Sequence, residues 1–203
     1  MPIDDPIDFP AADFDGLIFD LDGTLVDSMP AHFKAWCEAL ATFKAAGVFQ
    51  EDVFYAMGGR PTKDIVIDLN DQYGLHLDPV AVAAAKRAAF MKNIGKVEIH
   101  EEVVEFARSQ RGKVPMAVAT GGTRIVAEKT LQVVGLSDLF DEVVTSDDVT
   151  NGKPDPEIFL EAAKRIDVAP ERCVAFEDAQ PGVLAAQAAG MRVVVVPTPV
   201  HLV

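Results

Sequence analysis

Cysteine is scarce in this 203-residue sequence, and no stretch approaches the ~20 consecutive apolar residues that a membrane span requires. The two cysteines, Cys37 and Cys173, are too few for a disulfide framework. We expect both to be reduced thiols that pack as small apolar residues. The first fifteen residues contain no Lys or Arg, which is unlike a signal peptide. We therefore expect a cytoplasmic protein that does not bind membranes.

Basic residues are also few, because 18 Lys and Arg stand against 32 Asp and Glu, a formal net charge of −14. A surface of this charge repels nucleic acids and anionic membranes, so neither is an expected partner. It also repels anionic substrates, and any phosphate-binding site must therefore gather its own cations or backbone amides. The glycine-loop signatures of nucleotide-binding proteins, G-x-G-x-x-G and G-x-x-x-x-G-K-[ST], are absent.

One segment, residues 16–26, leads an apolar run directly into two closely spaced carboxylates. The run predicts a buried strand, and Asp20 and Asp22 follow it on the same side because side chains alternate along a strand. Two neighbouring carboxylates repel each other and need a cation or a proton. Gly23 permits a tight turn, and Thr24 adds a hydroxyl suited to a phosphate and a hard divalent ion. Read alone, such acidic residues are equally typical of a strand end with ordinary turn and cap residues.

The chain changes character twice. Residues 30–96 are typical of successive helices, with turn signals at Gly47, residues 58–61 and residues 73–74. From residue 99 onward, helix and strand patterns alternate, which is typical of a parallel doubly wound sheet. We predict an α/β fold: a Rossmann-like doubly wound core formed by residues 1–28 and 98–203, with an all-helical domain inserted at 29–97.

The expected core elements are short. Strands are predicted at residues 17–19, 114–119, 142–145, 173–176 and 192–196, and helices at 100–108, after Gly122, from Pro156 and at 181–189. Asp155 is the expected cap of the helix that begins at Pro156. Residues 1–13, rich in Pro and Asp, are expected to form a loose terminus.

Ligands of open α/β sheets bind beyond the carboxyl ends of the strands, where four separate segments would meet. These segments are DLDGTLVDS, VATGG, NGKPDPEIFLEAA and VAFEDAQPGV. Together they resemble the four motifs of the haloacid dehalogenase superfamily, in order and over nearly the whole chain. Within that superfamily the sequence most resembles the sugar phosphatases, of the fructose-1-phosphatase type, and the beta-phosphoglucomutase-like group.

The resemblance implies a magnesium-dependent phosphoryl transfer. Asp20 would be the nucleophile that forms an aspartyl phosphate, and Asp22 the general acid and then the general base, with a pKa that its surroundings must raise. Thr120, Lys153 and the backbone amides of Gly121 and Gly122 would neutralise the phosphoryl charge. The expected Mg²⁺ ligands are Asp20, the Asp22 carbonyl, Asp178 and, through water, Glu177.

The helical insertion would supply the substrate contacts. His32 and Trp36 are four residues apart, hence on one helix face. The residues alone favour core positions for both, and the resemblance implies that they face the substrate. Arg60 and Lys63 lie in a segment that resembles the substrate-specificity loop of the family, and they bring two cations toward a bound anion. Thr62 occupies the place where the mutases have an arginine, which favours a phosphatase.

Three functions remain open at this stage. The leading hypothesis is a phosphatase that hydrolyses a small sugar monophosphate, as a monomer or weak homodimer. The first alternative is a beta-phosphoglucomutase that returns the phosphoryl group to the sugar. The second is a non-catalytic binding module on the same fold, which predicts damage in the motif set, and no damage is seen. Asp22 argues against a dehalogenase, and the two-Asp motif argues against a phosphonatase.

Overall fold

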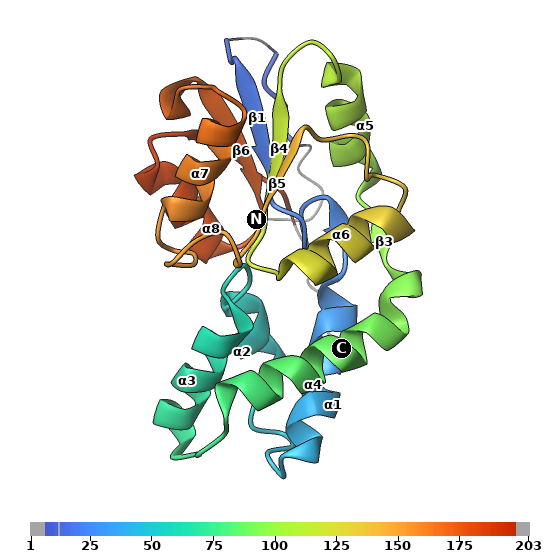
Figure 1. The fold of residues 1–203 in the computed structure, drawn as a ribbon, viewed down its shortest axis with the longest axis vertical. Helices are drawn as coiled ribbons and strands as arrows, with labels where there is room; N and C mark the ends of the chain where they lie inside the picture. Colours follow the sequence, from blue (N-terminus) through green and yellow to red (C-terminus); the bar gives the residue numbers. More distant parts are fainter. Residues whose placement is uncertain (1–6, 12, 198–203) are drawn as a thin grey trace.

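The computed structural model describes residues 7–11 and 13–197, and its centre is a five-stranded parallel sheet (Figure 1). The strands lie in the order β5-β4-β1-β6-β7. They are β1 (Gly16–Phe19), β4 (Met116–Ala119), β5 (Glu142–Val144), β6 (Cys173–Glu177) and β7 (Arg192–Val195). The predicted α/β class and the parallel sheet are confirmed, and β1 pairs with both β4 and β6.

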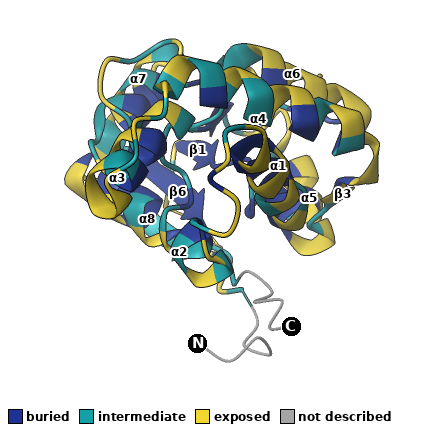
Figure 2. Ribbon diagram, turned by 90° about the horizontal axis from the view of Figure 1, so that it is seen from below, coloured by how far each residue is buried: buried dark blue, intermediate teal, exposed yellow. Residues whose placement is uncertain are grey.

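Helices cover both faces of the sheet because successive β1 side chains point in opposite directions. Leu17 and Phe19 join the apolar cluster formed with α5 and α6, whereas Ile18 joins the cluster formed with α7 and α8. These helices are α5 (Glu101–Gln110), α6 (Arg124–Val133), α7 (Glu157–Arg165) and α8 (Gln180–Ala188). Figure 2 shows β1 and β6 as buried strands in the interior of the molecule.

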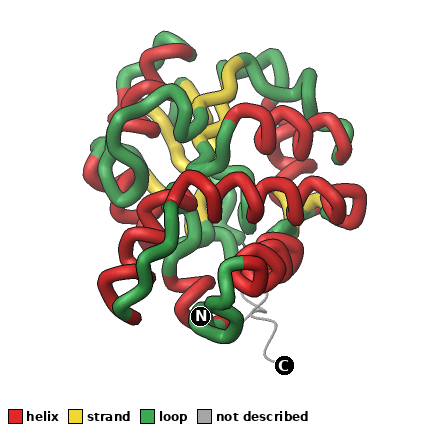
Figure 3. Tube along the Cα trace, turned by 60° about the horizontal axis from the view of Figure 1, so that its bottom comes forward, coloured by secondary structure: helices red, strands yellow, loops and turns green. Residues whose placement is uncertain are grey.

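A helical layer lies at the carboxyl end of the sheet (Figures 1 and 3). It contains α1 (Met29–Thr42), α2 (Glu51–Ala56), α3 (Thr62–Tyr73) and α4 (Pro79–Asn93), followed by the 3-10 turn η1 (Ile94–Lys96). The layer has an apolar cluster of its own, which includes Trp36, Phe54 and Leu69. The assignment of residues 29–97 to a separate domain stays a prediction.

The two connections between the layer and the sheet lie side by side. They are β2 (Val26–Asp27) and β3 (Glu98–Ile99), which pair antiparallel with Val26 opposite Ile99. The sequence analysis did not anticipate this ribbon, because two-residue strands carry too few side chains to show a periodic pattern.

Three expectations need correction. Cys37 is exposed, since it lies on the outer face of α1 beside the buried Trp36, whereas Cys173 is buried as expected. The start of the chain is not wholly loose, because Phe9 stacks on Phe106 at 4.7 Å between ring centroids. Helix α7 begins at Glu157, one residue later than predicted, although Asp155 still accepts its first N–H at 3.0 Å. Residues 1–6, 12 and 198–203 of the predicted core lie outside the described residues.

In the described part of the chain, no helix is both long enough and apolar enough to span a membrane.

Removing one apolar side chain from the helical layer tests its packing. Leu69 on α3 is fully buried, and Leu69→Ala should lower the free energy of unfolding by about 2–5 kcal/mol through lost transfer energy and a cavity. Ile67, on the same helix but 48% exposed, is the matched control, and Ile67→Ala should change it by less than about 0.5 kcal/mol. Chemical denaturation measures both, and equal effects would contradict the described packing.

Candidate active site

A cavity of about 390 Å³ separates the carboxyl end of the sheet from the helical layer. Most of the predicted site residues line it, from both sides. The sheet side contributes Asp20, Asp22, Thr120, Gly121 and Gly122, and the helical side contributes His32, Trp36, Arg60 and Lys63. Side chains from distant parts of the sequence therefore converge on one space, as expected for the carboxyl end of a parallel sheet.

Directly beside this cavity, the buried ammonium group of Lys153 holds two carboxylates together. Its Nζ donates to Asp20 Oδ1 at 2.5 Å, to Glu177 Oε1 at 2.6 Å and to the carbonyl oxygen of Ala119 at 3.0 Å. Burial by itself would lower the pKa of Lys153, but the two carboxylates outweigh it and raise the pKa above 10.5. Lys153 is therefore a fixed positive charge, with none of its side chain exposed.

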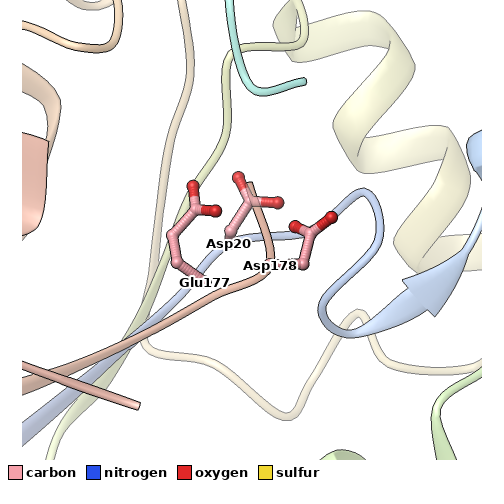
Figure 4. Close-up of side chains that lie close together, drawn as sticks. All are labelled: Asp20, Glu177 and Asp178. Atoms are coloured by element: carbon pink, nitrogen blue, oxygen red, sulfur yellow. The ribbon is translucent and has the colours of Figure 1, made fainter. Parts of the chain in front are cut away.

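Three carboxylates form an acidic cluster around Asp20 (Figure 4). One oxygen from each of Asp20, Glu177 and Asp178 lies within 4.8 Å of the others. Burial raises the pKa of Asp20 well above 3.8, Lys153 opposes this rise, and the neighbouring carboxylates add to it. Lys153 brings one positive charge to three acidic groups, so the donor set fits a hard divalent cation that takes oxygen ligands.

The turn after β1 brings its backbone close to this cluster. Gly23 has a φ of +96°, and a Cβ at this position would lie 2.2 Å from Asp178 Oδ2. Glycine is therefore required here by both conformation and space. The neighbouring Thr24 donates its hydroxyl to Asp178 Oδ1 at 3.0 Å and is fully buried. Thr24 does not line the cavity, so its contact with Asp178 replaces the direct substrate contact that the sequence suggested.

Asp22 is not part of the acidic cluster and belongs to a second hydrogen-bonded network. Its Oδ1 accepts from Ser28 Oγ at 2.6 Å and lies 2.9 Å from His32 Nε2. The other imidazole nitrogen, Nδ1, lies 2.9 Å from Lys86 Nζ. Since Lys86 can only donate, Nδ1 accepts and His32 Nε2 carries the hydrogen that it donates to Asp22. Lys86, His32 and Asp22 thus form one hydrogen-bonded chain.

The expectation that its surroundings raise the pKa of Asp22 is wrong for this arrangement. Burial does act to raise this pKa, but the hydrogen bond that His32 donates, the Ser28 hydroxyl and the charge of Lys86 outweigh it and lower the pKa well below 3.8. Asp22 is therefore a carboxylate. Burial, and then the nearby Lys86, lower the pKa of His32, while burial lowers the pKa of Lys86 to about 8.

Lys86 is the functional candidate that the sequence analysis missed. It lies in the middle of α4, in a run of alanines without any recognisable motif. One signal was available: Lys86 and Phe90 are four residues apart, hence on one helix face. In the structure Phe90 stacks on the His32 ring with centroids 3.9 Å apart, beside the Lys86 contact.

The other predicted contact residues, Arg60, Trp36 and Thr120, already have partners within the protein. Arg60 lines the cavity, but its guanidinium forms an ion pair with Asp68 on α3 at 2.5 Å. Trp36 also lines the cavity and is almost fully buried against Phe49. The Thr120 hydroxyl accepts from Gly122 N at 3.0 Å and so shapes the turn after β4.

Two acidic residues in the loop after β5 connect this loop to the turn after β4. Asp147 Oδ2 accepts from Arg124 N at 2.9 Å, and Asp148 Oδ2 lies 2.5 Å from the Arg124 guanidinium. Asp148 also accepts from Arg165 on α7 at 3.0 Å. Together these contacts fix the loop that carries Lys153 against the loop that carries Thr120.

Comparisons with known proteins show the family to which the chain belongs. Residues 14–190 match the family of haloacid dehalogenase-like hydrolases. The chain is 41% identical over 179 residues to the fructose-1-phosphate phosphatase YqaB of Escherichia coli (strain K12), covering 87% of this chain and 93% of that protein. It is 33% identical over 181 residues to a phosphorylated carbohydrates phosphatase of Thermotoga maritima, covering 87% and 82%. A solved structure described as a putative beta-phosphoglucomutase from Bacteroides vulgatus superimposes with a TM-score of 0.81 at 27% identity, covering 93% of this chain and 78% of that one.

The hydrogen-bonded network of Lys86, His32 and Asp22 predicts a change in the pKa of His32 when Lys86 is replaced. Because the Lys86 ammonium adds to the effect of burial and lowers the pKa of His32, Lys86→Met should raise that pKa toward the ordinary histidine value of 6.5. NMR titration of the His32 ring in the two proteins measures this. Lys63→Met, which removes the same charge from another part of the cavity wall, should have a smaller effect. An unchanged or lower pKa in Lys86→Met would contradict the network.

Proposed function

Because the chain belongs to the haloacid dehalogenase-like hydrolase family, we propose that it is a phosphatase that hydrolyses a small sugar monophosphate through an aspartyl-phosphate intermediate. The observation that carries this proposal is the position of Asp20. It lines the cavity, lies against a fixed lysine charge, and belongs to a carboxylate cluster that fits a divalent cation. A nucleophile, charge neutralisation and an enclosed space are what phosphoryl transfer requires.

In the first step, an Asp20 carboxylate oxygen attacks phosphorus. A bond forms between this oxygen and phosphorus, and the ester bond breaks with its electron pair going to the sugar oxygen. Lys153 stays charged throughout and stabilises the phosphoryl oxygens from beside Asp20, where the low local dielectric strengthens its effect.

The leaving sugar oxygen needs a proton, and Asp22 is ionised in this structure. We assign the supply to the hydrogen-bonded chain: Lys86 gives a proton to His32 Nδ1, His32 Nε2 passes its own to Asp22, and Asp22 passes it to the leaving oxygen. Because the pKa of Asp22 lies well below 3.8, the transfer is concerted with breaking of the ester bond, and the leaving oxygen is the final proton acceptor. Lys86, with a pKa of about 8, is the donor.

In the second step, water attacks phosphorus and gives a proton to the Asp22 carboxylate, from which it returns through His32 to Lys86. The bond between phosphorus and Asp20 breaks, and inorganic phosphate leaves. The low pKa of Asp22 is consistent with a group that is ionised before this step begins. One side chain then serves both steps, first passing a proton and then accepting one.

Magnesium is the proposed cofactor, with Asp20, Asp178 and the Asp22 carbonyl as its ligands and Glu177 as an outer contact. Glu177 already accepts from Lys153 and from Ala179 N, at 2.6 and 2.9 Å, which favours an indirect role. When bound, Mg²⁺ would supply positive charge to the phosphoryl group.

The substrate class rests on two supports. The relatives at 41% and 33% identity are named as phosphatases of fructose 1-phosphate and of phosphorylated carbohydrates. The Arg60 guanidinium is paired with Asp68, which favours a monophosphate over a bisphosphate, whose second phosphate would compete with Asp68. The mutase alternative, suggested by the Bacteroides vulgatus structure, is an outcome of the test below.

A substrate panel tests the function. The purified protein with Mg²⁺ is incubated with sugar monophosphates, including fructose 1-phosphate and beta-glucose 1-phosphate with a trace of glucose 1,6-bisphosphate, and phosphate and glucose 6-phosphate are measured separately. We expect phosphate release. Glucose 6-phosphate without phosphate release would make the protein a mutase. If neither product were detected, both assignments would be overturned.

Replacing the nucleophile tests the mechanism. Asp20→Asn should abolish phosphate release while leaving the fold intact, because it removes the attacking oxygen's charge but little volume. Asp138→Asn, an exposed change in the same layered core, should keep full activity. Normal turnover by Asp20→Asn would exclude the aspartyl-phosphate intermediate.

The metal assignment predicts a separate effect. Asp178→Asn should increase the Mg²⁺ concentration needed for half-maximal phosphate release by at least about tenfold, because one anionic ligand is lost. Treatment of the wild-type protein with EDTA should stop turnover, and added Mg²⁺ should restore it. An unchanged Mg²⁺ requirement in Asp178→Asn would remove this residue from the ligand set.

A further inference from the structure

The segment 58–61, between α2 and α3, rests on the sheet side of the cavity at two glycines. A Cβ atom built on Gly121 would lie 2.1 Å from the carbonyl oxygen of Gly59. A Cβ atom built on Gly152 would lie 2.3 Å from Cγ and 2.5 Å from Cδ of Pro61. Non-bonded heavy atoms do not approach so closely, so any larger residue at either position would displace the 58–61 segment from the sheet side of the cavity.

The backbone does not require glycine at these two positions. Neither Gly121 nor Gly152 is among the described residues with a positive φ, so alanine would be unstrained there apart from the contact itself. The missing side chains therefore serve the fit between the segment and the core. Glycine carries an entropic cost on folding, which makes two such positions informative.

The 58–61 segment also covers the buried side chain of Lys153. A Cβ atom on Gly59 would lie 3.2 Å from Cδ of Lys153, and one on Gly58 would lie 3.0 Å from Cβ of Ala179. Lys153 directly follows Gly152 in the chain, so the Pro61 contact and the covered lysine are on the same loop. Water is kept from Lys153 partly by this segment.

From these contacts we infer that Pro61 and Gly152 are positioning residues for the reaction: their contact seats the 58–61 segment over Lys153, and turnover of the sugar ester depends on it. This inference rests on the proposed function. Contacts to the non-reacting part of a substrate contribute to rate only when the covering segment is in place, so an unseated segment lowers kcat/KM for the sugar phosphate.

A pair of substitutions isolates the contact. Gly152→Ala should lower kcat/KM by about 10- to 100-fold, the size of effect expected from small misplacements in an active site. Adding Pro61→Ala removes Cγ and Cδ, the two atoms in the way, and leaves Cβ at 3.8 Å, an ordinary contact. The double variant should therefore recover most of the lost activity. Gly121→Ala meets a backbone oxygen, so Pro61→Ala should not rescue it.

Hydrogen–deuterium exchange of the peptide covering residues 57–62 gives a second readout that does not need activity. Exchange should increase in Gly152→Ala, and in the double variant it should match Pro61→Ala alone, which carries the same added amide hydrogen at position 61. Gly95→Ala is the matched control, because nothing lies within 4 Å of the added methyl group, and it should change neither readout.

The outcomes separate the two claims. Wild-type activity and exchange in Gly152→Ala would overturn the inference. A loss that Pro61→Ala does not rescue would also overturn it, because the cause would then be local disturbance of Lys153. A wild-type protein without activity on any phosphate ester would overturn the proposed function, while the exchange measurements would still decide whether the segment is seated by this contact.

Discussion

The buried ion pair between Lys153 and the carboxylates of Asp20 and Glu177 is the interaction on which the site depends. Burying one ammonium group is costly, and the two carboxylates at 2.5 and 2.6 Å offset that cost. Asp20 follows β1, Lys153 lies in the loop after β5, and Glu177 is the last residue of β6, so these contacts also fix three strand ends relative to one another. The parallel order of the sheet makes this meeting possible, because the carboxyl ends of neighbouring strands lie at one edge.

Asp20 and Asp22 are two residues apart in sequence and lie in opposite electrostatic environments. Burial raises the pKa of Asp20, whereas Asp22 is held as a carboxylate by the chain from Lys86 through His32. Environments that separate the pKa values of neighbouring acids are how active sites give them different tasks. Here the difference comes from the helical layer, since His32 and Lys86 belong to α1 and α4. The layer thus sets the ionisation of a side chain at the edge of the sheet.

The sequence was sufficient for the sheet and for the convergence of Asp20, Thr120, Lys153 and Asp178, because apolar strands of fixed order bring their ends together. It was insufficient wherever a role depends on the direction of a side chain. The pKa of Asp22 was expected to rise, and it falls because Ser28 and His32 happen to face it. Lys86 has no motif around it, and only the packing of α1 against α4 places it beside His32. Short strands such as β2 and β3 lack the length for a pattern.

The position of the 58–61 segment determines how strongly Lys153 can act on a charged group in the site. An ammonium group acts strongly on a phosphoryl oxygen only while water is kept away, since the effective dielectric falls with burial. Lys153 is buried partly by backbone that passes over it at Gly59. A protein with a net charge of −14 therefore has to cover its lysine as well as place it. Because Gly121 and Gly152 have no side chains, the 58–61 segment can come close enough to cover Lys153. These two glycines therefore influence how strongly water screens the lysine charge.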